Sequence, residues 1–249
     1  MRIRSVIAAT ILGFAPIAGM ADDFMPDMKD VHFTAGVRVW RTDWSTWGNL
    51  TTNDYQHAEL RYSVIPVVSV SYRNFFLSGS YQAPGTFKFK PNSTLSGTST
   101  FSGFEFRRRE YDLNFGYFIV PGLAVTAGWK NVRYEEPGST YRWTAKGPTI
   151  GASGNAPVAD WVSLYGNIGY GRPKVDDLTH FRSQRGKYLL TEFGFAFPLG
   201  PHANALTGAV LTAGYRYQRI GAYPSTALFS SVEVFETAQG PVAGFAMRF

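Results

Sequence analysis

Apolar and polar residues alternate with a period of two through almost the whole chain, and this pattern constrains the fold more than any other feature. Successive side chains of an extended strand point to opposite faces, so the alternation predicts strands with one apolar and one polar face. In the final stretch GPVAGFAMRF, Phe245, Met247 and Phe249 share one face, whereas Arg248 lies on the other. About ten such segments can be recognised, at residues 30–40, 58–72, 75–82, 110–119, 123–130, 147–155, 161–171, 188–197, 208–218 and 240–249.

The composition of the two faces favours a barrel over a soluble β-sandwich. A sandwich also alternates, but it buries its apolar face against a second sheet. Here the apolar face is large and aromatic, and the other face carries Gly, Ser, Thr and charged residues, which suits lipid outside and a polar lumen inside. Aromatic residues near the predicted strand ends fit interfacial girdles, namely Trp40, Tyr72, Tyr81, Tyr117, Trp129, Trp161, Tyr170 and Tyr217.

The connections between the segments alternate in length. Turns marked by Pro, Gly or Asn lie at residues 72–74, 120–122, 157–160 and 198–205, whereas residues 41–57, 83–109, 133–146, 171–187 and 219–231 form longer, polar connections. Both chain ends then lie on the short-turn side, which requires an even number of strands. The sequence therefore predicts an all-β, closed antiparallel, transmembrane up-and-down barrel of about ten strands, with eight or twelve as the alternatives.

The N-terminus predicts export. Arg2 and Arg4 precede the apolar run VIAATILGFAPIAGM, and small residues flank a cleavage site at its end, so residues 1–21 are expected to be a cleaved signal peptide and residues 22–249 the barrel. The chain has no Cys, which excludes thiol chemistry and disulfides. Its net charge is +6, or +4 without Arg2 and Arg4, which is too small to indicate nucleic-acid binding.

The signal peptide, the alternating spans, the long-loop and short-turn hairpins and the final strand ending in Phe249 resemble the small bacterial outer-membrane barrels of the OmpA-, OmpX- and OmpW-like kinds. The resemblance covers the whole mature chain and implies a location in the bacterial outer membrane. It also implies that the barrel-assembly machinery recognises the last strand, a role that falls on Phe249 with Phe245 and Met247 as same-face neighbours.

Charged residues of nearly balanced sign lie on the predicted lumen face. Paired charges satisfy one another, and a barrel of this size is closer to the small, filled type than to open porins, so we expect an ion-pair network that largely fills the lumen. The alternative is a charged constriction in a narrow, porin-like diffusion channel for ions or small polar solutes. The residues concerned are Arg38, Glu59, Arg61, Glu110, Asp112, Lys130, Glu192, Arg216 and Arg248.

The long connections are basic and are expected to face the cell exterior. Arginine binds phosphate well, so these residues are candidates for contact with lipopolysaccharide, with a merely solvated loop surface as the alternative. The candidates are Arg107, Arg108, Arg109, Arg142, Arg182, Arg185 and Lys187. Adhesion to an extracellular ligand would instead use exposed loop aromatics such as Trp44 and Trp47.

Evidence for catalysis in the sequence is weak. The stretch VDDLTHF brings Asp176, Asp177 and His180 together, and ten-strand outer-membrane proteases use Asp and His pairs at the outer rim, but this spacing differs from theirs. No G-x-S-x-G or H-E-x-x-H motif occurs. We therefore predict a non-enzymatic protein without metal or cofactor, with a structural or surface-interaction role. The narrow channel is the alternative, and an outer-rim protease or lipid A hydrolase comes after it.

Overall fold

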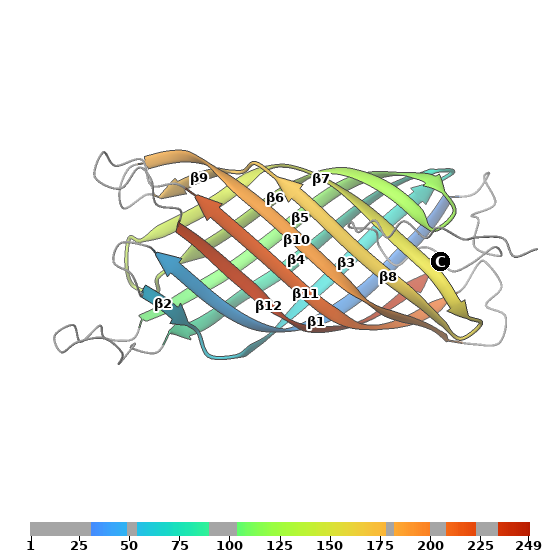
Figure 1. Ribbon diagram of the computed structural model, residues 1–249, viewed down its shortest axis with the longest axis horizontal. Helices are drawn as coiled ribbons and strands as arrows, with labels where there is room; N and C mark the ends of the chain where they lie inside the picture. The colour runs from blue at the N-terminus through green and yellow to red at the C-terminus, as the bar shows by residue number, and fades with distance from the viewer. Residues whose placement is uncertain (1–30, 49–53, 90–103, 178–181, 200–207, 223–233) are drawn as a thin grey trace, which may run out of the picture.

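The computed structural model describes residues 31–48, 54–89, 104–177, 182–199, 208–222 and 234–249. These residues form an all-β structure (Figure 1). Ten strands build the barrel: β1 (Val31–Gly48), β3 (Arg61–Tyr72), β4 (Phe75–Phe89), β5 (Phe104–Val120), β6 (Leu123–Glu135), β7 (Arg142–Ala159), β8 (Val162–Gly171), β10 (Arg182–Leu199), β11 (Ala209–Ala222) and β12 (Val234–Arg248). The short strands β2 (Asp54–His57) and β9 (Lys174–Asp177) continue the lines of β3 and β8. The predicted signal peptide lies outside the described residues.

The sheet closes on itself, as the alternation predicts. Each barrel strand pairs antiparallel with its chain neighbour, and β12 pairs with β1 to complete the cylinder. At this seam Val37 lies opposite Phe245, and the backbone N–H of Phe249 donates to the Phe33 carbonyl over 2.8 Å. The apolar alternation of the last residues is therefore explained by a strand that pairs on both sides almost to the chain end. The predicted closed antiparallel barrel of ten strands is confirmed.

The two ends of the barrel differ. Tight turns join β3 to β4, β5 to β6 and β7 to β8 at one end, where Arg73 and Gly122 have φ angles of 53° and 75°. The C-terminus lies at this end, whereas β2 and β9 lie at the other (Figure 1). Following the loop rule for outer-membrane barrels, we call the short-turn end the periplasmic end and the opposite one the extracellular end.

The strands extend further at the extracellular end than the sequence suggested. Residues 41–48 belong to β1, residues 83–89 to β4 and residues 104–109 to β5, although all were expected in loops. The side chains continue to alternate there, but the polar and apolar faces exchange places. Polar residues such as Asp43 face outward, and aromatic residues such as Trp44 face inward. The barrel wall therefore projects beyond the lipid-facing band.

A band of apolar side chains surrounds the outer surface of the barrel. Large apolar residues are exposed on every strand that crosses it, such as Val37, Leu113 and Phe195, which is the expected surface for contact with lipid. Most of the predicted girdle residues lie exposed on this face, namely Tyr72, Tyr81, Tyr117, Trp129, Trp161 and Tyr170. Trp40 does not, because it shares the inward parity of Arg38 and is fully buried in the lumen. No helix in the part of the chain that the structure describes is long and apolar enough to cross a membrane.

Candidate functional site: the charged lumen

Charged side chains from six strands meet inside the barrel. Strand alternation places them there, because residues at i and i+2 share a face. Each is at most 7% exposed, and the set balances at four cations and four carboxylates. We call it the lumen network: Arg38 of β1, Arg108, Glu110 and Asp112 of β5, Lys130 of β6, Glu192 of β10, Arg216 of β11 and Glu236 of β12.

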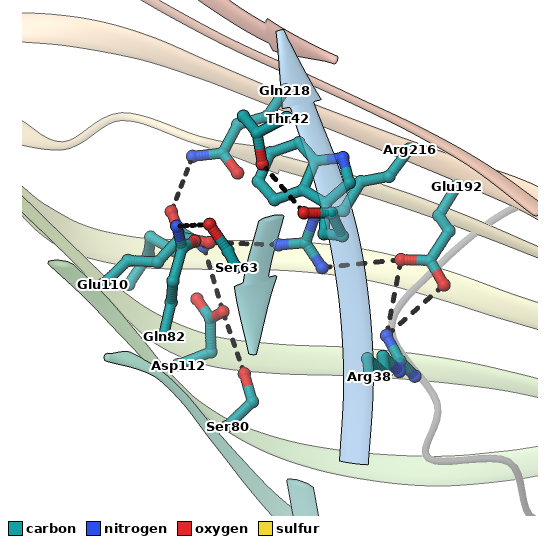
Figure 2. Close-up of polar contacts among 12 residues, drawn as sticks. Arg38, Thr42, Ser63, Ser80, Gln82, Glu110, Asp112, Glu192, Arg216 and Gln218 are labelled. Atoms are coloured by element: carbon teal, nitrogen blue, oxygen red, sulfur yellow. Dashed lines mark hydrogen bonds and ion pairs between the residues drawn. The ribbon is translucent and has the colours of Figure 1, made fainter. Parts of the chain in front are cut away.

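Arg216 is the central link of the lumen network (Figure 2). Its Nη2 lies 3.2 Å from Oε1 of Glu110, and its Nη1 lies 3.4 Å from Oε2 of Glu192. Both carboxylate oxygens of Glu192 are also 3.3 Å from Nη1 of Arg38. A continuous line of opposite charges therefore crosses the lumen from β1 through β10 and β11 to β5.

Glu110 collects several further donors. Nζ of Lys130 lies 3.4 Å from Oε1, and Nη2 of Arg108 lies 3.4 Å from Oε2. The Gln218 amide donates to Oε2 over 3.0 Å (Figure 2). Nζ of Lys130 also donates to Oδ2 of Asp112 over 2.9 Å, and Nη1 of Arg108 lies 3.8 Å from Oε1 of Glu236. Buried carboxylates are tolerated only when paired and hydrogen-bonded, so these residues depend on one another.

Aromatic rings cover three of the four cations. Cζ of Arg216 lies 4.9 Å from the ring centroid of Trp40, and Cζ of Arg108 lies 5.1 Å from that of Trp44. Nζ of Lys130 lies 5.3 Å from the centroid of Tyr188. These are cation–π distances, and such contacts strengthen when water is excluded. The lumen network is thus held by aromatic packing as well as by charge.

A cluster of aromatic side chains lies extracellular to the network. Its centre is Trp44, which is fully buried and whose ring lies 5.1 Å from Phe87, 5.0 Å from Phe89 and 5.3 Å from Tyr134. Phe106 completes this aromatic cluster at 6.1 Å from Trp44. The expectation that Trp44 is an exposed loop residue was therefore wrong. The side chain of Trp47 lies outside the described residues.

Glycines make room for large side chains in the periplasmic half of the lumen. A Cβ at Gly116 would overlap the ring of Phe76, and one at Gly214 would overlap the Tyr165 hydroxyl. A cavity of about 10 Å³ beside Arg38, bordered by Ser69, is only large enough for a single water molecule. Side chains therefore also occupy this half of the barrel.

The structure brings together six of the nine predicted lumen residues: Arg38, Glu110, Asp112, Lys130, Glu192 and Arg216. It places Glu59 and Arg61 elsewhere, because both are exposed, and Nη1 of Arg61 donates to the Thr86 carbonyl. Arg248 lies buried near the periplasmic mouth, one residue before the chain end.

Sequence reasoning missed Arg108 and Glu236. Arg108 stands in the stretch 83–109, which was expected to be a loop, and Glu236 stands before the last predicted segment at residues 240–249, so the inward parity of both was not used. Arg108 was expected to contact lipopolysaccharide, and that prediction was wrong, because its side chain is fully buried inside the barrel. Arg108 precedes Glu110 by two residues, and in a strand this spacing indicates that both side chains lie on the same face.

The other lipopolysaccharide candidates lie on the outer wall where their side chains are described. Arg107, Arg142, Arg185 and Lys187 are exposed, and Arg109 is half-buried. The side chain of Arg182 lies outside the described residues.

The catalytic candidates are only partly described. Asp176 lies on the outer wall, with its carboxylate 3.1 Å from Nζ of Lys174 and 3.9 Å from Nζ of Lys146. Partial burial opposes ionisation, but hydrogen bonds from Lys174 and Ser183, together with the positive charges of Lys174 and Lys146, outweigh it and lower the pKa of Asp176. The side chain of Asp177 and all of His180 lie outside the described residues. Within the described ranges, no group of three or more His, Asp or Glu is placed to hold a metal ion.

The closed ten-strand wall, the apolar outer band and the charged lumen define the class: a transmembrane β-barrel of the outer-membrane type. A scan against protein-family models finds no match, and no curated protein matches the sequence significantly.

A comparison with solved structures finds similar chains at low sequence identity. The outer-membrane protease OmpT of Escherichia coli superposes with a TM-score of 0.50 at 12% identity over 88% of this chain and 97% of its own. A FadL homologue of Pseudomonas aeruginosa reaches 0.38 at 9% identity, covering 91% of each chain. Ail, the attachment invasion locus protein of Yersinia pestis, reaches a TM-score of 0.33 at 14% identity over 87% of this chain and 98% of its own. The likeness to OmpT shows the shared fold.

Proposed function

We propose that this outer-membrane barrel has a structural or surface-interaction role and that its lumen is closed to solutes. The observation that carries the proposal is the line of paired charges through Arg216, which joins Glu192 to Glu110 across the lumen. The aromatic cluster around Trp44 forms a second barrier on the extracellular side.

The charge balance explains why the network would resist ion flow. A cation entering the lumen meets carboxylates that already hold Arg216, Arg38 and Lys130, and an anion meets cations that are already neutralised. Separating such buried partners is strongly unfavourable, at about 3–5 kcal/mol for each broken pair. A passing ion would also have to displace buried aromatic rings, which offer it little of the solvation that it loses.

Conductance across a planar lipid bilayer tests this proposal. We expect the purified, refolded protein to give no steady channel openings. The paired variant Glu110→Ala/Arg216→Ala removes the centre of the network without changing its net charge, and it should introduce small openings. Leu113→Ala, a substitution on the lipid face, is the matched control and should stay silent.

Steady, reproducible openings of the wild-type protein would refute the closed lumen. They would favour the second candidate, a narrow diffusion channel, in which the lumen network selects among ions by charge.

We also propose that the protein is not a hydrolase. The ion pairs of Asp176 with Lys174 and Lys146 support this view, because they engage the carboxylate on the outer wall. The test is to incubate the wild type with peptide and lipid A substrates, alongside a variant carrying Asp176→Asn and His180→Ala. Turnover by the wild type that this variant loses would contradict the proposal.

A further inference from the structure

A patch of like charges lies on the outer wall of β7, β9 and β10. Lys146 of β7 is directly opposite Lys174 of β9, which is in turn directly opposite Arg185 of β10. All three side chains are exposed. Like charges that face each other across strands destabilise a sheet. A bound anion would offset the repulsion among the three cations of this row.

Two further cations enlarge the patch toward the lipid band. Arg172 precedes Lys174 by two residues, and Lys187 follows Arg185 by two, so both lie on the same outer face. We call the five residues the outer basic patch: Lys146, Arg172, Lys174, Arg185 and Lys187. The carboxylate of Asp176 lies 3.1 Å from Nζ of Lys174 and 3.9 Å from Nζ of Lys146, so two cations of the row share one carboxylate.

The height of the patch on the barrel indicates the kind of anion. The row next to the patch on its periplasmic side consists of Ile150 of β7, Tyr170 of β8 and Leu189 of β10, and Tyr170 is the direct cross-strand neighbour of the other two. Ile150 is 65% exposed and Tyr170 is 39% exposed, so this row belongs to the lipid-facing surface. Aromatic residues of such barrels sit at the level of the lipid headgroups. Nε of Arg172 donates to the Tyr170 hydroxyl over 3.4 Å, which links the patch directly to that level.

The spacing of the cations suits a phosphate group. Adjacent strands lie about 5 Å apart, so long Lys and Arg side chains from two or three strands can converge on one anion. Arginine can in addition bind a phosphate through two parallel hydrogen bonds. A lipid held here would place its acyl chains against Ile150 and its neighbours.

We infer that the outer basic patch is a binding site for the phosphate groups of an outer-leaflet lipid, as lipopolysaccharide carries them. This inference deepens the surface-interaction role proposed above by naming a ligand class and a site. It differs from the sequence-based expectation, since the site lies on the strand wall and includes Lys146, Arg172 and Lys174.

Strands β5 and β6 and the first residue of β7, Arg142, offer a matched control surface. They carry exposed Arg107 and half-buried Arg109 at the same end of the barrel, but carboxylates are interspersed there. Glu135 lies opposite both Arg107 and Arg142, and its carboxylate is 2.6 Å from Nη2 of Arg133. Removing three cations from this surface changes the total charge equally without touching the patch.

Binding of purified lipopolysaccharide to the full-length mature protein in detergent micelles tests the inference. The patch variant is Lys146→Gln/Lys174→Gln/Arg185→Gln, and the control variant is Arg107→Gln/Arg109→Gln/Arg142→Gln. We expect the patch variant to lose affinity by about tenfold or more and the control by less than about threefold. Enzymatically dephosphorylated lipopolysaccharide should bind the wild type as weakly as intact lipopolysaccharide binds the patch variant.

Equal losses in the two variants, or undiminished binding of the dephosphorylated lipid, would overturn the inference. Full displacement of the lipid by millimolar inorganic phosphate would assign the patch to free phosphate instead and would also overturn it. Heat-modifiable gel migration verifies that each variant is folded, and the single variant Lys174→Gln, with an expected loss of about threefold, provides a milder second test. The outcome is independent of the conductance measurement, because the patch faces away from the lumen.

Discussion

The substitution Arg216→Met examines the central link of the lumen network. The guanidinium is 2% exposed, contacts Glu110 at 3.2 Å and Glu192 at 3.4 Å, and stacks over Trp40. Removing one partner of a buried ion pair leaves an uncompensated charge and typically costs about 3–5 kcal/mol. Here Glu110 keeps Lys130 and Glu192 keeps Arg38, so we expect the lower part of this range, about 3 kcal/mol.

A second variant separates charge from packing. Arg216→Met/Glu192→Gln removes one cation and one carboxylate, which restores the balance of the network, and the amide oxygen of the new glutamine side chain can still accept from Arg38. We therefore expect the double variant to be less destabilised than the single variant, by about 1–2 kcal/mol. Arg142→Met, at an exposed position, should stay within about 0.5 kcal/mol of the wild type.

The assay is reversible urea unfolding in lipid vesicles, followed by tryptophan fluorescence, with heat-modifiable migration to verify folding. If the single and double variants lost the same stability, charge balance in the lumen would be irrelevant and the reasoning would fail. If Arg216→Met were as stable as Arg142→Met, the lumen would be hydrated enough to screen its charges.

Three further predictions concern the packing of the lumen and the chain end. Trp44→Ala should lower the free energy of unfolding by about 3–5 kcal/mol because it empties the aromatic cluster, whereas Trp161→Ala at the exposed outer face should cost much less, as urea titrations would show. Gly116→Ala forces a Cβ into the ring of Phe76 and should cost about 1–3 kcal/mol, whereas Gly79→Ala has its nearest contact at 3.7 Å and should be nearly neutral; equal effects would contradict the tight packing. Deleting Phe249 should reduce assembly in cells more than stability in vitro, since we propose that this residue is recognised by the barrel-assembly machinery; normal surface levels of the truncated chain would count against that role.

The barrel itself could be predicted from the sequence. Period-two alternation with an aromatic outer face leaves a closed sheet in lipid as the physically acceptable arrangement, because an open edge would expose unpaired backbone groups. The same alternation correctly predicted most of the side chains that face the lumen, including Arg38, Lys130 and Glu192. The short turns and the even strand number are likewise properties of the local sequence.

The extracellular half could not be predicted in the same way. Trp44, Phe87 and Arg108 look like loop residues when polar neighbours are read as a loop signal, but they lie inside a wall that continues beyond the lipid. Outside the bilayer both faces of a strand can be polar or apolar, so alternation no longer tells which face is which.

The sequence by itself determined the strand periodicity, the lipid face and the sign of the charges within each strand. Only the tertiary structure decided which charges meet. Glu110 and Arg216 are separated by 106 residues and become partners because closure of the cylinder brings β5 and β11 to face each other across the lumen. The row of Lys146, Lys174 and Arg185 likewise exists only in the register of β7, β9 and β10, since a shift of one residue in that register would turn one of the cations toward the lumen.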